Sequence, residues 1–266
     1  MKFKIDHDYH LHSFLSSCSR DPEQTPERIL SYARENGLSQ ICLTDHYWDS
    51  AVPGASKWYE PQNFDHIKEA KPLPQAEGIE FMFGCECEMD QYTTLGLPPE
   101  RYDDFDFIII PTTHLHMGFT IAPEDRDSNK RRGELWAERL GALLDKDLPF
   151  HKVGVAHLAC NLINKKSRED YLEALSFVPD SVMRELFTRA ASVGCGIELN
   201  KSDMSFADEE ADAVLRPFRI AKECGCKFYI GSDAHHPASF ASCRSVFMRA
   251  VDLLGLTEDD KFHIGR

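Results

Sequence analysis

Residues 3–12 read Phe-Lys-Ile-Asp-His-Asp-Tyr-His-Leu-His, a short run that ends in two histidines separated by one residue. The run is too short for a helix and predicts a β-strand over residues 3–9. Because side chains alternate between the two faces of a strand, His10 and His12 should point to the same side. This arrangement, a buried strand followed directly by side chains that bind metals, recurs along the chain.

Six further apolar runs, rich in Ile, Val and Phe, predict six more strands. They cover residues 40–43, 79–84, 107–110, 153–156, 196–199 and 227–230. Most are too apolar for half-exposed antiparallel strands and favour parallel strands that are buried on both faces. Segments with helical patterns lie between them. In the first, Thr25 and Pro26 predict the start of a helix and Gly37 its end.

Four other segments have the same helical pattern, at residues 135–144, 181–192, 211–224 and 239–254. Regular alternation of strands and helices is typical of an α/β barrel or a doubly wound sheet. No Gly/Ser linker or change of composition divides the chain, so we expect one domain over residues 1–266. Residues 47–78 and 117–133 lack periodicity and predict two long loops, which in a compact domain are usually either functional lids or disordered.

The composition excludes several classes of protein. With 30 Lys and Arg against 44 Asp and Glu, the net charge of −14 disfavours duplex nucleic acid as a partner. The nine cysteines form no Cys-x-x-Cys pair and predict reduced thiols rather than a disulfide framework. No apolar run approaches 18 residues, and residues 1–8 lack the apolar core of a signal peptide. We therefore expect neither a membrane span nor export, and a cytoplasmic location.

Histidine or acidic residues follow six of the seven predicted strands. They are His10, His12, His46, Glu86, His114, His157, Asp233 and His235. The carboxyl ends of the strands of a parallel barrel open on one face, so these side chains should meet there. Imidazoles and carboxylates bind divalent metals, and burying such a cluster without a metal would be costly. Four other histidines are expected to lie outside this site, at positions 7, 66, 151 and 263.

These motifs resemble those of the PHP (polymerase and histidinol phosphatase) family of metal-dependent phosphoesterases. His-x-His at residues 10–12, Thr-Asp-His at 44–46, Gly-x-Glu at 84–86 and Gly-Ser-Asp-x-His at 231–235 follow the family order. The long segment after His46 is most similar to the histidinol-phosphatase branch. The resemblance implies a distorted (β/α)7 barrel, with a site for three divalent metal ions at the C-terminal ends of the strands.

The resemblance also assigns ligands to each metal. The first metal would be held by His10, His12, Glu86 and Asp233, the second by Glu86, His114 and His157, and the third by His46, His235 and Cys18. Cys18 stands where the family commonly has histidine. A thiolate there would favour zinc or iron over manganese or magnesium. The alternative is a plain buried thiol with a weakly held third metal, and the identity of the metals stays open among zinc, iron and manganese.

In this interpretation, two neighbouring metals share a water, lower its pKa and direct a bridging hydroxide at phosphorus, while the third neutralises phosphate oxygens. The expected catalytic residues are Glu86, Asp233 and His235, with Asp233, His235 or a metal-bound water as donor to the leaving group. The expected phosphate-binding residues are Arg20, Lys201, His116 and Arg132, and for each a solvated charge is the alternative. Glu88 and His116 should support the ligands or contact the substrate.

The leading functional prediction is therefore hydrolysis of a small phosphorylated metabolite, with L-histidinol phosphate as the first candidate. One alternative is a phosphoesterase of the same family acting on nucleotides or short oligonucleotides. A second is an amidohydrolase-type enzyme that cleaves C–N or lactone bonds. That class usually uses a lysine after the fourth strand, and residues 107–114 contain none. A third alternative, a metal-binding regulator without turnover, conflicts with the full set of ligands.

Overall fold

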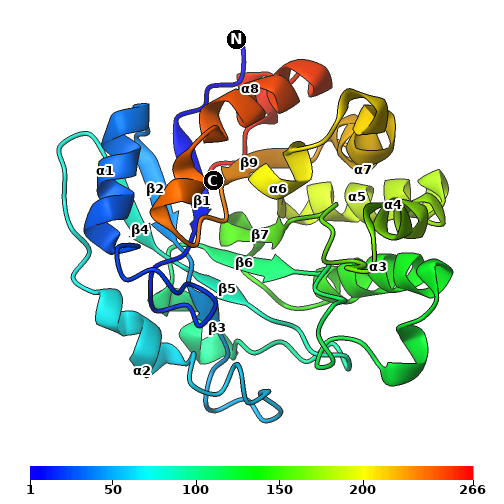
Figure 1. Ribbon diagram of the computed structural model, residues 1–266, viewed down its shortest axis with the longest axis horizontal. Helices are drawn as coiled ribbons and strands as arrows, with labels where there is room; N and C mark the ends of the chain where they lie inside the picture. The colour runs from blue at the N-terminus through cyan, green and yellow to red at the C-terminus, as the bar shows by residue number, and fades with distance from the viewer. Residues whose placement is uncertain (266) are drawn as a thin grey trace.

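A computed structural model describes residues 1–265, which form nine short strands and eight α-helices (Figure 1). The strands are β1 (His7–Leu11), β2 (Gln40–Leu43), β3 (His46–Tyr47), β4 (Glu80–Phe83), β5 (Cys85–Cys87), β6 (Ile108–Pro111), β7 (Val153–Ala156), β8 (Gly196–Asn200) and β9 (Lys227–Gly231). They pair in the orders β1-β2-β4 and β3-β5-β6-β7-β8-β9, and every pair is parallel. Because β3 follows β2 and β5 follows β4 almost directly, the nine pieces occupy the seven expected strand positions.

The array curves so that its first and last strands meet. Among residues 1–265, β1 and β9 form no continuous ladder, but a parallel bridge joins Leu11 to Ala234 just beyond β9. The amide of Asp233 donates to the carbonyl of His10 at 2.8 Å, and that of His12 donates to the carbonyl of Ala234 at 3.1 Å. This incomplete closure, together with the split strands, confirms the expected α/β architecture with a distorted barrel.

The helices lie around the outside of the strands (Figure 1). They are α1 (Pro26–Asn36), α2 (Phe64–Ile67), α3 (Asn129–Leu144), α4 (Arg168–Ser176), α5 (Asp180–Val193), α6 (Lys201–Met204), α7 (Ala211–Glu223) and α8 (Cys243–Leu254). The predicted caps of α1 are confirmed. The Thr25 side chain accepts from the Arg28 amide at 3.2 Å, and Gly37 ends the helix in the left-handed conformation, at φ 65°.

Several helices differ from the prediction, α3 and α4 the most. The short helices α2 and α6 were not expected, and α8 begins at Cys243, four residues later than predicted. Helix α3 begins at Asn129, six residues earlier than expected, because the Ser128 side chain caps it by accepting from the Arg131 amide. Arg131 and Arg132 therefore lie in a helix and not in a loop. Helix α4 was not expected, and it buries only Tyr171, Ala174 and Leu175. Three buried positions in nine residues are a weak periodic signal.

The interior of the barrel is closed by apolar side chains from six strands. The cluster contains Tyr9, Cys42, Met82, Phe107, Ile109, Ala156, Tyr229 and Phe262. Gly154 on β7 makes room for this cluster, because a Cβ there would lie 2.5 Å from the Tyr229 ring. A larger core lies between the strands and the outer helices. All nine cysteines, which lie within the described residues, are unpaired, as predicted.

Within residues 1–265, no helix has the length and apolar character needed to cross a membrane.

Arg139 of α3 is buried and connects two loops at the carboxyl end of the barrel. Its guanidinium donates to the carbonyls of Thr112 (3.0 Å), Asp90 (2.9 Å), Met89 (2.6 Å) and Thr120 (3.2 Å). The chain segments after β5 and β6 therefore depend on one side chain for their shape. Removing a buried donor of this kind leaves several carbonyls without a partner, which is costly.

We therefore expect Arg139→Met to lower the free energy of unfolding by about 3 kcal/mol or more, measured by urea denaturation. Arg219→Met is the matched control, because Arg219 is exposed and pairs only with the exposed Asp212. The control should change stability by about 0.5 kcal/mol or less. Equal stability of the two variants would contradict the role given to Arg139.

Candidate metal centre

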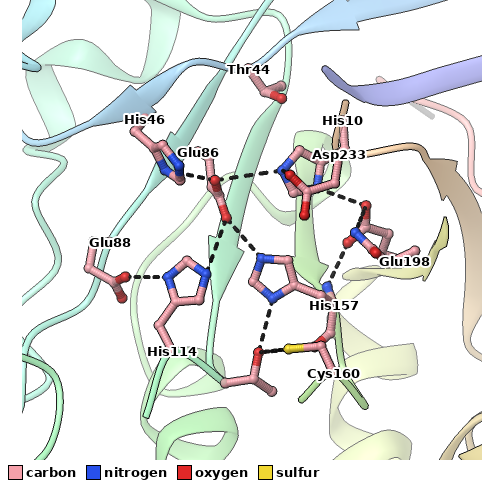
Figure 2. A network of polar contacts seen from close by, with 12 residues as sticks. His10, Thr44, His46, Glu86, Glu88, His114, His157, Cys160, Glu198 and Asp233 are labelled. Carbon is pink, nitrogen blue, oxygen red and sulfur yellow. Dashed lines mark hydrogen bonds and ion pairs between the residues drawn. The ribbon is translucent and has the colours of Figure 1, made fainter. Parts of the chain in front are cut away.

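Eight of the nine predicted metal ligands come together at the carboxyl ends of the strands (Figure 2 labels six of them). They form four overlapping groups, whose ligand atoms lie within 4.8 Å of one another. The groups are His10–His12–Glu86, Glu86–His114–His157, His10–His157–Asp233 and His12–His46–His235. Parallel strands bring these side chains to one face, as expected from the barrel. The second group has the same residues as the predicted second metal site.

Glu86 of β5 lies at the centre of the cluster, and its two oxygens face different histidines. Oε2 lies 2.8 Å from His46 Nδ1, 3.4 Å from His12 Nε2 and 3.6 Å from His10 Nε2. Oε1 lies 3.0 Å from His157 Nε2 and 3.9 Å from His114 Nε2. One carboxylate thus serves two sets of imidazoles, which is the arrangement expected of a ligand that bridges two ions.

Asp233 closes the cluster on the side of β9. Its Oδ1 lies 3.2 Å from His12 Nε2, 3.5 Å from His10 Nε2 and 3.4 Å from His235 Nδ1. Asp233 and His157 both have positive φ, at 54° and 29°, a conformation that is uncommon for residues other than glycine. Backbone strain of this kind concentrates at functional sites, and here it occurs at two of the predicted ligands.

The unpaired polar atoms of the cluster fit a cation. Glu86 Oε2 and His46 Nδ1 are buried, and neither has a hydrogen-bond partner among the described residues. The two atoms lie 2.8 Å apart, but their orientation does not form a hydrogen bond. His10 Nε2 and His12 Nε2 also approach within 3.0 Å. Imidazole nitrogens and carboxylate oxygens at this spacing match the donor set of zinc and similar ions.

The charges in the cluster keep the acids ionised. Burial raises the pKa of a carboxyl group, but the positive charges of His46 and His10 hold the pKa of Glu86 well below its ordinary value. Burial, together with the charges of His235 and His46, lowers the pKa of His12 well below its ordinary value. An ionised carboxylate and a neutral imidazole are the forms that bind divalent metals.

Two buried glutamates orient the imidazoles from behind (Figure 2). Glu198 Oε1 lies 2.8 Å from His10 Nδ1, and its Oε2 accepts from the His157 amide at 2.5 Å. Glu88 Oε2 lies 2.6 Å from His114 Nδ1 and also accepts from the Tyr59 hydroxyl at 3.2 Å. A carboxylate that holds Nδ1–H leaves Nε2 free to face a metal. The supporting role expected for Glu88 agrees with these contacts.

Glu198 was missed in the sequence as a functional residue. The available signal was an acid inside the otherwise apolar run Gly196–Asn200, where strand residues are all buried. Gly231, the last residue of β9, lies at the contact between Glu198 and His10. A Cβ at Gly231 would collide with the Glu198 carboxylate and lie 2.6 Å from the His10 Cβ. Gly231 therefore makes room for the contact between Glu198 and His10.

Cys18 lies beside the cluster but belongs to none of the four groups. Much of the residue is exposed, and its thiol lies near His46 and His235. Partial burial opposes ionisation, but the charge of His46 and a hydrogen bond to His235 lower the pKa of Cys18 to about 6. Coordination by Cys18 stays a prediction.

The structure corrects two of the four phosphate-binding predictions. Arg132 is buried in α3, where its guanidinium donates to the carbonyls of Leu115, Ile163 and Arg126, so it is not available to a substrate. Lys201 donates to the carbonyls of Ser239 and Ala241 and does not line the central cavity. Both predictions are wrong because backbone carbonyls of neighbouring loops occupy these cations.

The other two predicted residues are close to the site. Arg20 lines a separate hollow that borders Cys18 and His235, and its contact with phosphate stays a prediction. His116 lines the central cavity, and its Nδ1 is buried without a partner among the described residues. Burial and the nearby charges of His114 and Lys165 lower the pKa of His116 to about 3, so the ring is neutral at pH 7.

The cavity above the cluster has a volume of about 560 Å³. Its floor contains seven predicted ligands, among them Glu86, His157 and Asp233. Its walls come from the loops after β3, β6 and β7 and include Trp58, Phe119 and Lys165. Lys165 was not singled out in the sequence. A cavity of this size accepts a small organic molecule.

Comparisons with known proteins agree with this description. The model of the PHP domain family matches residues 8–202, more than two thirds of the chain. The match ends before Asp233 and His235, so the place of these two residues in the site rests on the geometry. No curated protein matches the chain significantly.

Two solved structures share the fold. One is histidinol phosphate phosphatase from Lactococcus lactis subsp. lactis Il1403, complexed with zinc, L-histidinol and phosphate. It is 20% identical, with a TM-score of 0.57 over 92% of this chain and 93% of that chain. The other is a protein from Listeria monocytogenes assigned as the histidinol phosphatase hisK. It is 14% identical, with a TM-score of 0.64 over 91% of this chain and 99% of that chain.

The supporting role of Glu198 can be tested by metal content. We expect Glu198→Gln to remain folded and to bind metal about tenfold more weakly, because the amide is a poorer partner for the His10 imidazole. Metal per chain is measured by mass spectrometry after dialysis against graded chelator. The control is Glu80→Gln, which changes an exposed glutamate of β4. If both variants retain metal equally, Glu198 does not orient the ligand.

The substitution Cys18→Ala tests whether the Cys18 thiol binds a metal ion. If Cys18 is a ligand, the variant should lose at most one equivalent of metal, because the residue belongs to one predicted site only. Cys224→Ala serves as the control, since this thiol is half-buried and lies outside the cluster. Metal content identical to that of the wild type would show that Cys18 is not a ligand.

Proposed function

The chain belongs to the PHP domain family, and on that premise we propose that it is a metal-dependent hydrolase of small phosphate monoesters. The observation that carries the proposal is the position of Glu86, whose two oxygens face two separate sets of imidazoles at the floor of an open cavity. The shared fold with a phosphatase that was crystallised with zinc, L-histidinol and phosphate supports it.

The four groups of ligands support up to three divalent ions. In the assignment carried over from the family, His10, His12, Glu86 and Asp233 would hold one ion, and Glu86, His114 and His157 a second. His46 and His235, which group with His12 in the structure, would hold a third together with the neighbouring Cys18. Such ions supply positive charge for the phosphate oxygens and make a nearby water more acidic. The need for them is physical, because a protein of net charge −14 otherwise repels a phosphate dianion.

The protein's own groups would handle the proton that the leaving oxygen requires. Asp233 and His235 have the most exposed side chains of the cluster, at 22% and 25%, whereas those of Glu86 and His10 are almost fully buried. The His235 Nδ1 also lies 2.9 Å from the carbonyl of Asp233, which fixes the ring at the mouth of the cavity. We assign the delivery of the proton to this pair because, among the eight clustered side chains, these two are the most open to solvent and both line the cavity.

L-Histidinol phosphate is the first substrate to assay. Its imidazole is a flat ring, and Trp58 offers a surface for stacking in the cavity, where its own ring meets that of His46 edge-on at 5.1 Å between centroids. Nucleoside monophosphates are the second set, because they also combine a phosphate ester with a flat ring.

The proposal predicts metal-dependent release of inorganic phosphate from a member of this panel. Treatment with chelator should abolish the release, and adding back zinc, manganese or iron should restore it. Glu86→Ala should lower kcat by about 10³-fold or more and reduce bound metal, because the substitution removes a ligand from two ions. His151→Ala is the control, since His151 is exposed and remote from the cluster. Full turnover by Glu86→Ala would refute the proposed centre.

A further inference from the structure

The upper walls of the cavity contain no acidic side chain. The chain carries 44 acids in 266 residues, yet the only acids that line the cavity are Glu86 and Asp233, which belong to the metal cluster. Among the side chains that line the walls, Lys165 is the one ammonium group. In so acidic a protein, a cavity wall with a lysine and no carboxylate is a local excess of positive charge.

Lys165 is available for a ligand. It is exposed, and it makes no hydrogen bond or ion pair with any residue in 1–265. Its neighbour Lys166 is different, because that ammonium pairs with Asp127 at 3.0 Å and does not line the cavity. A lysine at the rim of a cavity that has no carboxylate of its own suits an anionic group of a bound molecule.

The rest of the walls suits a flat ring. Trp58 is 37% exposed, an unusual exposure for this side chain in a protein that buries Trp48 and Trp136 almost completely. Phe119, Met117 and Leu162 complete the apolar lining on the sides formed by the loops after β6 and β7. The Tyr59 hydroxyl is bonded to Glu88, so its polar atom is already satisfied. Aromatic and apolar walls of this kind gain from covering an aromatic ring.

We propose that the cavity selects a phosphate monoester whose alcohol carries a flat ring and, at its outer end, a second anionic group that pairs with Lys165. The inference rests on the proposed function and narrows its substrate class. The unpartnered Nδ1 of His116 is a further polar contact for such a group. The anion can be a carboxylate or a second phosphate, because both pair with an ammonium.

An ammonium on the leaving group fits less well. Aromatic rings attract cations, but the contribution is modest at sites open to water. Lys165 repels a second cation, and the walls have no carboxylate to compensate. L-Histidinol phosphate satisfies the requirement for a ring, but its amine does not match Lys165. We therefore expect it to be a poorer substrate than an ester of similar size with an outer carboxylate.

The test uses para-substituted benzyl phosphates, which keep the basicity of the leaving oxygen nearly constant. The substituents are hydrogen, carboxylate, phosphonate and aminomethyl, and L-histidinol phosphate is assayed beside them. For the metal-loaded enzyme, kcat/KM should be about tenfold higher for the carboxylate or phosphonate ester than for the unsubstituted one, and lowest for the aminomethyl ester. The carboxylate and phosphonate arms separate the two sources of negative charge.

Variants at residue 165 identify the group responsible. Lys165→Ala should remove the preference for the anionic esters, and Lys165→Glu should invert it in favour of the aminomethyl ester. Lys166→Ala is the matched control and should keep the wild-type order. A wild-type preference for the aminomethyl ester or for L-histidinol phosphate would overturn the inference while leaving the phosphatase activity intact. An equal loss with every ester in Lys165→Ala would also overturn it, because Lys165 would then contact the scissile phosphate.

Binding measurements test this inference independently of the proposed hydrolase function. Non-hydrolysable benzylphosphonates with the same substituents are titrated into the metal-loaded protein by calorimetry. The affinities should follow the same order and should lose it in Lys165→Ala. If no ester is hydrolysed but this order is seen, the proposed function fails and the inference about the cavity stands. Affinities that do not depend on the substituent would refute the inference whatever the turnover.

Discussion

A buried carboxylate between two sets of imidazoles is the constraint on which the structure depends. Glu86 lies almost out of contact with water, and both of its oxygens face nitrogen atoms and not amide donors. An ionised group in such a place is unstable unless positive charge surrounds it. The imidazoles supply part of that charge, and divalent ions held between them would supply the rest. The barrel places Glu86 there because β5 has a neighbouring strand on each side, β3 and β6, so that histidines from both directions can reach its carboxylate.

The imidazoles of the cluster keep their orientation because other buried side chains contact them on the side away from the cavity. Glu198 connects His10 to the backbone of His157, and Glu88 connects His114 to Tyr59. Arg139 in turn lies 3.4 Å from Glu88 and holds the carbonyls of the loops after β5 and β6. The site and the packing of α3 are therefore one network. A change in the helix can alter the orientation of a ligand without touching it.

The same network bears on the proposed binding of a phosphate ester by an acidic protein. The chain has a net charge of −14, but the only carboxylates that line the cavity are Glu86 and Asp233 on its floor, where they lie among histidines. Divalent ions held at the floor would offset the long-range repulsion of a phosphate ester. The inference about Lys165 adds one ammonium at the exposed rim of the same cavity.

Local patterns in the chain were sufficient to predict the strands, the caps of α1 and the clustering of eight of the nine candidate metal ligands. Short-range rules govern these features, because a strand ends where its apolar run ends, and a histidine next in sequence must lie at the same end of the barrel. The partners of long charged side chains follow no such rule. Arg132 and Lys201 bind backbone carbonyls from distant loops, Glu198 reaches His10 across the barrel, and Lys165 is left free at the cavity. A flexible side chain goes to whichever acceptor the folded chain brings within reach, and that acceptor is far away in the sequence.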